Sequence, residues 1–175
     1  MTHQGQAGQG EGENLVDFMT RFTGSQQFNR VFQEGMSLVE ETADYLDGPG
    51  RAEARELPRP AALAYASESM RLTTRLMQLA SWLLLQRAIS SGEISAGSAA
   101  EEQERINLEE AGLGSDGPHH ENLPHGLLDL IARSRLLHAR IVKLDARLKA
   151  RATPPAHNPV ASHLDMLSQA FGNKR

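Results

Sequence analysis

The chain has 175 residues and a net charge of −4, and hydrophobic residues make up 39% of it but aromatic residues only 5%. This length suffices for one domain with a real core, and the low aromatic content favours helices over large sheets. The absence of cysteine excludes disulfides, zinc–thiolate sites and thiol catalysis, and it fits a reducing cytoplasm. Residues 1–13 are Gly- and Gln-rich and acidic, unlike a signal peptide, so we expect a flexible segment over residues 1–24.

The first long helix is expected over residues 25–47. Ser25 has the residue type of an N-cap, and Asp47-Gly48-Pro49-Gly50 is a motif that ends helices. Gly35 lies in the middle of the apolar face, where glycine costs about 1 kcal/mol of helix propensity. We therefore expect Gly35 to allow the close approach of a neighbouring backbone. Residues 51–60 are interpreted as a linker.

The longest periodic segment predicts a central helix over residues 60–91. Its apolar residues form two adjacent stripes that together cover roughly half of the helix circumference, which predicts at least two neighbouring helices. The first stripe consists of Leu72, Leu76, Leu79 and Leu83. The second stripe consists of Leu63, Ala66, Met70, Thr73, Met77, Ala80 and Leu84. The opposite, solvated side is expected to carry Glu68, Arg71, Arg75 and Gln78.

Trp82 and Leu85 interrupt this order, because they fall on the polar side of the central helix. Two interpretations stay open for them. They cap a loop locally, or they form a dimer or partner contact, since an exposed Trp beside a Leu is typical of interface cores. The polar residues Gln78 and Gln86 interrupt the most apolar part of this helix, so a membrane span is not predicted.

The third long helix is expected over residues 124–150, where a heptad seam is typical of a helical bundle. The seam consists of Leu127, Leu130, Ser134, Leu137, Ile141, Leu144 and Leu148, and it is widened by Leu128, Ile131, Leu136 and Val142. Between the second and third long helices, a short acidic helix over residues 95–111 is expected to pack loosely after a Ser95 or Ser98 cap.

The third helix is basic, with seven Lys or Arg residues and two Asp in segment 124–151. Its residues Arg140, Lys143 and Arg147 are candidates for binding acidic partners. Segment 24–50 carries five acidic residues and one Arg, so the first and third helices would neutralise each other if they packed side by side. No interleaved aromatic residues are present for base stacking, and nucleic-acid binding is therefore disfavoured.

A tail over residues 152–175 follows Thr153-Pro154-Pro155. Ser162-His163-Leu164-Asp165 has the pattern of a capping box, and Leu164, Leu167 and Phe171 follow at helical spacing. A short apolar helix on a flexible tether is common for segments that dock on partners. The alternative is that these three residues pack on the bundle as a fourth element.

No motif for catalysis, a cofactor or a metal stands out. In the stretch His119-His120-Glu121-Asn122-Leu123-Pro124-His125 the histidines do not have the spacing of a zinc-protease helix. The glycines of residues 112–117 follow no predicted strand and open no long helix, unlike a phosphate-binding loop. We therefore expect a protein that is not an enzyme and that has no cofactor.

Two stretches resemble a known family: FTGSQQFNRVFQEGMSLVEETADYLDGPGR over residues 22–51, and LPRPAALAYASESMRLTTRLMQLASWLLLQRAISSGE over residues 57–93. The family is the alphaproteobacterial one of the regulator of CtrA degradation, RcdA. The run MRLTTRLMQLASWLLLQRA is the most specific part of this resemblance, and residues 124–151 match more loosely.

The resemblance implies a cytoplasmic, homodimeric helical bundle without enzymatic activity, with recruitment to a cell pole left open. In that family the role is that of an adaptor for the ClpXP protease. The adaptor binds to ClpXP that the response regulator CpdR has primed. It presents cargo that includes the cell-cycle regulator CtrA, and it works with a second adaptor, PopA.

The sequence therefore predicts an all-α, antiparallel bundle of three long helices over residues 25–151, between flexible tails. Its expected function is to deliver CtrA-like cargo to ClpXP as a homodimer, with Trp82 and Leu85 at the dimer interface. The alternatives are a dimeric scaffold that only localises partner proteins and, less favoured, a nucleic-acid-binding helical protein.

Overall fold

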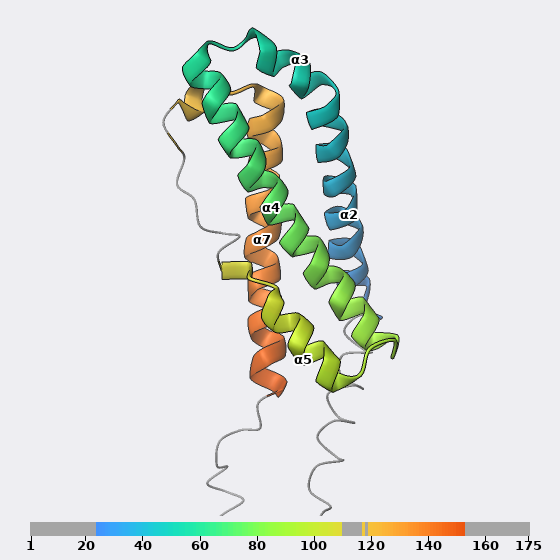
Figure 1. Ribbon diagram of the computed structural model, residues 1–175. Helices are drawn as coiled ribbons and strands as arrows, with labels where there is room; N and C mark the ends of the chain where they lie inside the picture. The colour runs from blue at the N-terminus through green and yellow to red at the C-terminus, as the bar shows by residue number, and fades with distance from the viewer. Residues whose placement is uncertain (1–23, 110–116, 118, 153–175) are drawn as a thin grey trace, which may run out of the picture. The chain divides into compact units, whose positions relative to one another are not determined.

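The computed structural model describes residues 24–109, 117 and 119–152, and every regular element in these ranges is helical (Figure 1). The three long helices are α2 (Gln26–Asp47), α4 (Arg59–Ser90) and α7 (His125–Ala152). The shorter elements are α3 (Pro49–Glu56), α5 (Ala96–Arg105) and the 3₁₀ turn η1 (His120–Asn122). The predicted all-α fold with three long helices is confirmed.

The chain divides into two compact units, residues 1–144 and residues 145–175. The described part of the second unit is the last portion of α7, where Lys149 Nζ lies 2.7 Å from Asp145 Oδ2. All contacts between helices given below lie within the first unit.

The starts of the helices follow the local sequence. Ser25 is the N-cap of α2, and its hydroxyl accepts a hydrogen bond from the Phe28 N–H at 3.2 Å, as predicted. Ser95 caps α5 in the same way through the Ser98 N–H at 3.3 Å. The predicted linker over residues 51–60 is wrong, because most of it belongs to α3. Pro49 suits the first turn of a helix, and the Ala, Glu and Arg residues that follow have high helix propensity.

The helix directions follow from the contacts. On α7, Arg133 pairs with Glu41 and Arg140 with Glu34, so α2 and α7 run antiparallel. The ring of Phe32 lies under the Arg87 guanidinium, at 4.9 Å, so the start of α2 lies beside the end of α4 and these two helices also run antiparallel.

In contrast, α4 and α7 run in the same direction. η1, just before α7, contacts α4, and further along both helices Arg75 donates a hydrogen bond to Ser134 Oγ at 3.0 Å. The chain has therefore returned to the starting end of α4 before α7 begins at His125.

The core lies where these three helices meet. The first stripe of the central helix and the predicted seam of α7 are both buried, as expected. Gly35 is buried on α2, and a Cβ there would lie 2.5 Å from Leu83 Cδ1 and 3.6 Å from Leu137 Cδ2. The neighbours of Gly35 are therefore side chains of α4 and α7 and not a backbone, which corrects the prediction. Leu136 does not widen the seam, because it is 67% exposed.

Among the described residues, no helix is both long enough and apolar enough to cross a membrane.

Candidate protein-binding face

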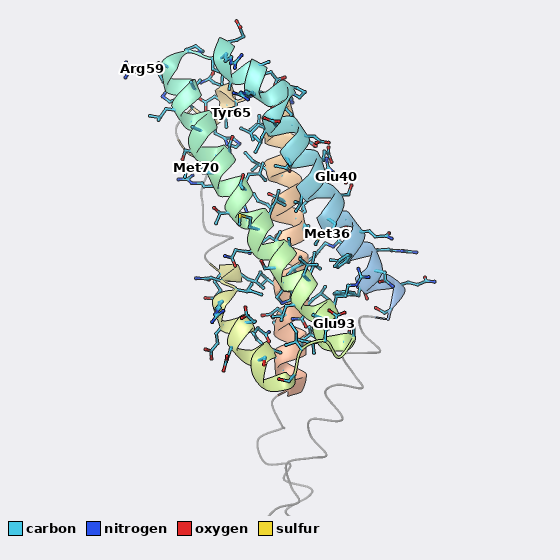
Figure 2. The ribbon with its side chains drawn as sticks, turned by 45° about the vertical axis from the view of Figure 1, so that its right-hand side comes forward. Met36, Glu40, Arg59, Tyr65, Met70 and Glu93 are labelled. Atoms are coloured by element: carbon cyan, nitrogen blue, oxygen red, sulfur yellow. The ribbon has the colours of Figure 1, made fainter. Side chains whose placement is uncertain are left out.

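The most unusual surface of the described chain is the outer side of α4. Four large apolar side chains are exposed there at seven-residue intervals: Leu63 is 73% exposed, Met70 72%, Met77 65% and Leu84 52%. Seven residues make almost two turns of an α-helix, so these side chains stand in one row. We call this row the exposed ridge. Figure 2 shows Met70 on the side of α4 that is turned away from α2.

Small side chains flank the exposed ridge on both sides. One flanking row consists of Ala66, Thr73 and Ala80, and the other of Ser67, Thr74 and Ser81; all six are at least partly exposed. From residue 72 to residue 86 the only charged residue of α4 is Arg75, and it is buried. Over residues 72–86 the outer face therefore lacks the charged side chains that the solvent side of a helix usually carries.

This arrangement corrects the prediction for the two stripes of the central helix. The first stripe is buried, whereas the large residues of the second stripe face outward. The side expected to be solvated is partly the inner one, because Glu68 is 4% and Arg75 2% exposed. Burial lowers the pKa of Arg75, and its guanidinium donates to Ser134 Oγ. Glu68 accepts a hydrogen bond from Arg71 at 2.8 Å.

Trp82 is 0% and Leu85 6% exposed within one chain, which favours the interpretation of a local cap over that of a dimer contact. The reason lies in α5 and the residues after it. α5 contacts α4, and the Asn107 N–H donates to Gln78 Oε1 at 3.1 Å. Trp82 and Leu85 follow Gln78 by four and seven residues, so they share the side of α4 that this segment covers. Because both side chains are buried within one chain, the structure does not support a dimer contact through them.

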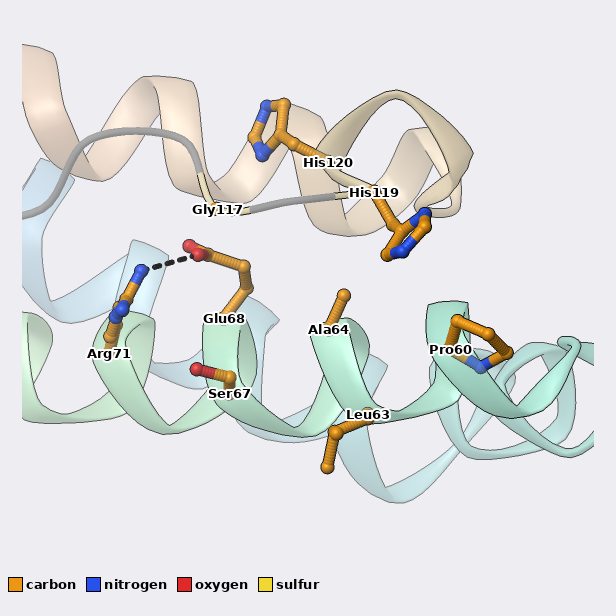
Figure 3. Close-up of a pocket in the computed structure, with 9 residues that line it drawn as sticks. All are labelled: Pro60, Leu63, Ala64, Ser67, Glu68, Arg71, Gly117, His119 and His120. Carbon is orange, nitrogen blue, oxygen red and sulfur yellow. Dashed lines mark hydrogen bonds and ion pairs between the residues drawn. The ribbon is translucent and has the colours of Figure 1, made fainter.

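A pocket of about 380 Å³ lies between the first half of α4 and the segment before α7 (Figure 3). Its described lining residues are Pro60, Leu63, Ala64, Ser67, Glu68, Arg71, Gly117, His119 and His120. Figure 3 shows Ala64 and Glu68 directed toward the histidines, whereas Leu63 points away from them. Glu68 and Arg71 form an ion pair in this wall. Among the described residues, no group of three or more His, Asp or Glu is arranged to hold a metal ion.

Two arginines on the basic side of α7, Arg133 and Arg140, pair with α2 within the first unit. Arg133 forms two hydrogen bonds to the Glu41 carboxylate, at 2.8 and 2.6 Å, and these bonds lower the pKa of Glu41. Arg140 binds Glu34 at 2.7 Å. The expected neutralisation between the first and third helices is confirmed for these two pairs. Of the predicted partner-binding residues, Arg140 is thus paired within the chain, and Lys143 and Arg147 are exposed.

The other predicted docking residues, Leu164, Leu167 and Phe171, lie outside the described residues. Their role in docking stays a prediction.

Comparison with known proteins adds to this geometry. The family described as "Protein of unknown function (DUF1465)" matches residues 19–171 of the chain. No curated protein matches the sequence. The crystal structure of RcdA from Caulobacter crescentus CB15 is similar, with 48% sequence identity and a TM-score of 0.60, and the match covers 74% of this chain and 96% of that chain. The chain therefore belongs to the DUF1465 family and is a relative of RcdA, as the resemblance over residues 22–93 indicated.

Proposed function

We propose that this chain is a non-enzymatic cytoplasmic adaptor that helps deliver cell-cycle regulators, CtrA-like cargo, to the ClpXP protease. The observation that carries this proposal is the 48% identity to RcdA over 96% of the RcdA chain. In the family that the sequence resembles, the partners are ClpXP primed by a CpdR-like response regulator, a PopA-like adaptor and a second copy of the chain.

The mechanism is tethering. An adaptor raises the effective concentration of its cargo at the unfoldase and needs no chemistry of its own. The apolar outer face of α4 supports a role in protein binding, because exposed apolar patches that lack charges are typical of interaction sites. The exposed Lys143 and Arg147, and the tail residues Leu164, Leu167 and Phe171, remain the proposed contacts for cargo or protease.

A dimeric scaffold that localises the same partners is the second candidate. The apolar α4 face favours it equally, since binding through that face does not require that degradation follows. Nucleic-acid binding is less favoured, because Arg133 and Arg140 already bind carboxylates of α2.

The test is reconstituted degradation of a CtrA-like cargo by ClpXP in the presence of the primed response regulator and a PopA-like adaptor. The reaction is run without this protein, with the full chain, and with a chain that ends at Arg151. A full chain carrying Leu164→Ser, Leu167→Ser and Phe171→Ser is the matched control, because it keeps the length of the tail and removes only its apolar residues.

Acceleration by the full chain that is lost in both tail variants is the expected result, and it would assign docking to the three apolar residues. Acceleration by all forms would move docking to the bundle. If the folded full chain binds cargo without accelerating its degradation, the adaptor proposal is wrong and the scaffold is favoured.

A further inference from the structure

The segment that follows α5 crosses from α4 to α7, and both helices hold it. The Asn107 N–H donates to Gln78 Oε1 on α4 at 3.1 Å. The carbonyl of the next residue, Leu108, accepts a hydrogen bond from His138 Nε2 on α7 at 2.5 Å. Because a carbonyl can only accept, this bond requires the proton of the His138 ring on Nε2. Side chains of two different helices thus bind the backbone of two consecutive residues.

Gln78 and His138 face each other where α4 and α7 meet. Arg75 donates to Ser134 Oγ across the same two helices at 3.0 Å. Gln78 and His138 follow these two residues by three and four positions, which is about one helical turn. We call Gln78 and His138 the crossing site.

Exposure along α4 shows what the crossing segment covers. Arg71, Gln78 and Leu85 stand in one row at seven-residue spacing. Arg71 is exposed, Gln78 is partly exposed and Leu85 is only 6% exposed. This side of α4 is therefore open before the crossing site and covered after it, where α5 contacts α4. Release of the segment would uncover Leu85.

This cover is lightly built. Of residues 95–109 whose side chains the structure describes, only Ala99 and Leu108 are buried. α5 has 10 residues, and isolated helices shorter than about 12 residues are marginal in water. Segments with few buried apolar contacts open at a lower free-energy cost than the core. A competitor that makes the same contacts can therefore displace this one.

The bound segment indicates which competitor fits the crossing site. Both hydrogen bonds use backbone atoms of the segment, so they do not depend on its side chains. Leu108 is 8% exposed, so a leucine side chain is taken up at the crossing. Glu104 and Glu109 are exposed on either side of the bound residues. An extended peptide with a leucine between acidic residues has the same features.

The charge of the neighbouring helices suits an acidic ligand. The charged side chains that act on Arg75 are Arg135, Glu68 and Arg71. Together with Arg75 they make three positive charges against one negative charge one turn before the crossing site. An acidic peptide is therefore attracted to this junction, and a basic one is repelled.

We propose that the crossing site binds a short acidic peptide segment of a partner protein through its backbone and one leucine, and that residues 106–109 of the chain occupy this site until the partner displaces them. None of the expected docking residues takes part, so the proposal goes beyond the adaptor role. It does not rest on that role, because peptide binding is measured without the protease.

The test uses a synthetic peptide of residues 103–109, acetylated and amidated, and full-length chains. Leu108→Ser is expected to weaken the internal contact and to bind the peptide at least about 10-fold more tightly than the natural chain. The reason is that the tethered segment of the natural chain competes at an effective concentration of the order of mM. The same peptide with Leu108→Ser is the control ligand and should bind at least about 10-fold more weakly.

Two signals report the binding. Calorimetry gives the Kd, and the fluorescence of Trp82, the single tryptophan of the chain, reports a change near the site because Trp82 follows Gln78 by four residues. In the Leu108→Ser chain, Gln78→Ala and His138→Ala should each weaken peptide binding roughly threefold or more. His125→Ala is the matched control, since His125 is an exposed histidine at the start of the same helix as His138, and it should leave the Kd unchanged.

A second variant guards against misfolding of Leu108→Ser, which circular dichroism would reveal. Asn107→Pro removes the N–H that Gln78 accepts and keeps Leu108. Ile106 has φ −89° and ψ 105°, which is backbone that a residue before proline adopts readily. This variant is also expected to bind the peptide more tightly than the natural chain.

Several results would overturn the proposal. Equal affinity of the peptide for the natural and the variant chains would place binding elsewhere, and so would binding that Gln78→Ala and His138→Ala leave unchanged. If a folded variant does not bind the peptide at mM concentration, or if both variants unfold, the segment is an integral part of the fold. Degradation is measured separately, so the adaptor proposal stands or falls on its own assay.

Discussion

Replacement of Trp82 by Ala is expected to destabilise the fold of each chain and not merely its association. Trp82 belongs to α4 and is 0% exposed. Removal of a buried Trp side chain typically costs about 3–5 kcal/mol. Because a domain of this size has a free energy of unfolding of about 5–15 kcal/mol, the loss is a large part of its total stability.

The adjacent pair Leu83 and Leu84 provides a matched comparison on the same turn of α4. Leu83 is 0% exposed and Leu84 is 52% exposed. We expect Leu83→Ala to cost about 2–5 kcal/mol and Leu84→Ala to change the free energy of unfolding of a single chain by no more than about 0.5 kcal/mol. Since association would add stability, all variants are compared in a chain that also carries Met70→Lys and Met77→Lys.

The assay is urea unfolding followed by far-ultraviolet circular dichroism, with the free energy obtained by linear extrapolation. Trp82→Phe keeps most of the side-chain volume and is measured as well, in case Trp82→Ala does not fold. The unsubstituted chain has a single tryptophan, so its fluorescence reports on Trp82 alone and should not change when a dimer is diluted to monomers.

One result would refute this reasoning. If Trp82→Ala leaves the unfolding midpoint of the single chain unchanged but abolishes association of the otherwise natural chain, then Trp82 is a surface contact. The burial that the structure assigns to it would be wrong.

Three further predictions concern the packing and charges of α2. Ser25→Ala removes the hydroxyl that caps α2 and should cost about 1 kcal/mol, whereas Ser25→Asp should largely restore the cap in urea unfolding. Gly126→Ala should lower the melting temperature by overpacking, worth about 1–3 kcal/mol, because the new Cβ would lie 2.5 Å from the Tyr45 ring; an unchanged melting temperature would contradict this. Arg133 lowers the pKa of Glu41 in the folded chain. Their ion pair therefore stabilises the fold at pH values above the pKa that Glu41 has in the unfolded chain, and this stabilisation is lost as the pH falls through the pKa of Glu41 in the folded chain. Both side chains are more than a third exposed, so Glu41→Gln should cost only about 0.2–1 kcal/mol at pH 7, and the difference from the natural chain should shrink as the pH falls below the ordinary pKa of a glutamate.

The long helices could be predicted from sequence to within one or two residues because local signals mark them. The Ser25 cap, the prolines at the start of α4 and the heptad seam of α7 act within a few residues of the elements that they define. The sequence does not predict α3, since Gly48, Pro49 and Gly50 are residue types that also mark loops, although Pro49 stands where a helix accepts proline.

The faces of α4 were harder to predict, for a physical reason. Periodicity places residues on faces, but it does not say which neighbour covers a face. Two apolar stripes compete for the core, and the polar side meets partners distant in sequence, since Asn107 donates to Gln78 and Arg75 donates to Ser134 of α7. The small residues that flank the exposed ridge were the available signal, because they mark a surface built for close approach.

The parallel course of α4 and α7 also has a consequence for the order of folding. α2 and α4 are joined by the short α3, whereas α4 ends at Ser90 and α7 begins only at His125. Local contacts cost less loop entropy and form faster. We therefore expect the α2–α4 hairpin to form in the transition state and α7 to dock later. Leu83→Val should then slow folding, whereas Leu137→Val should chiefly speed unfolding, although both side chains meet at Gly35.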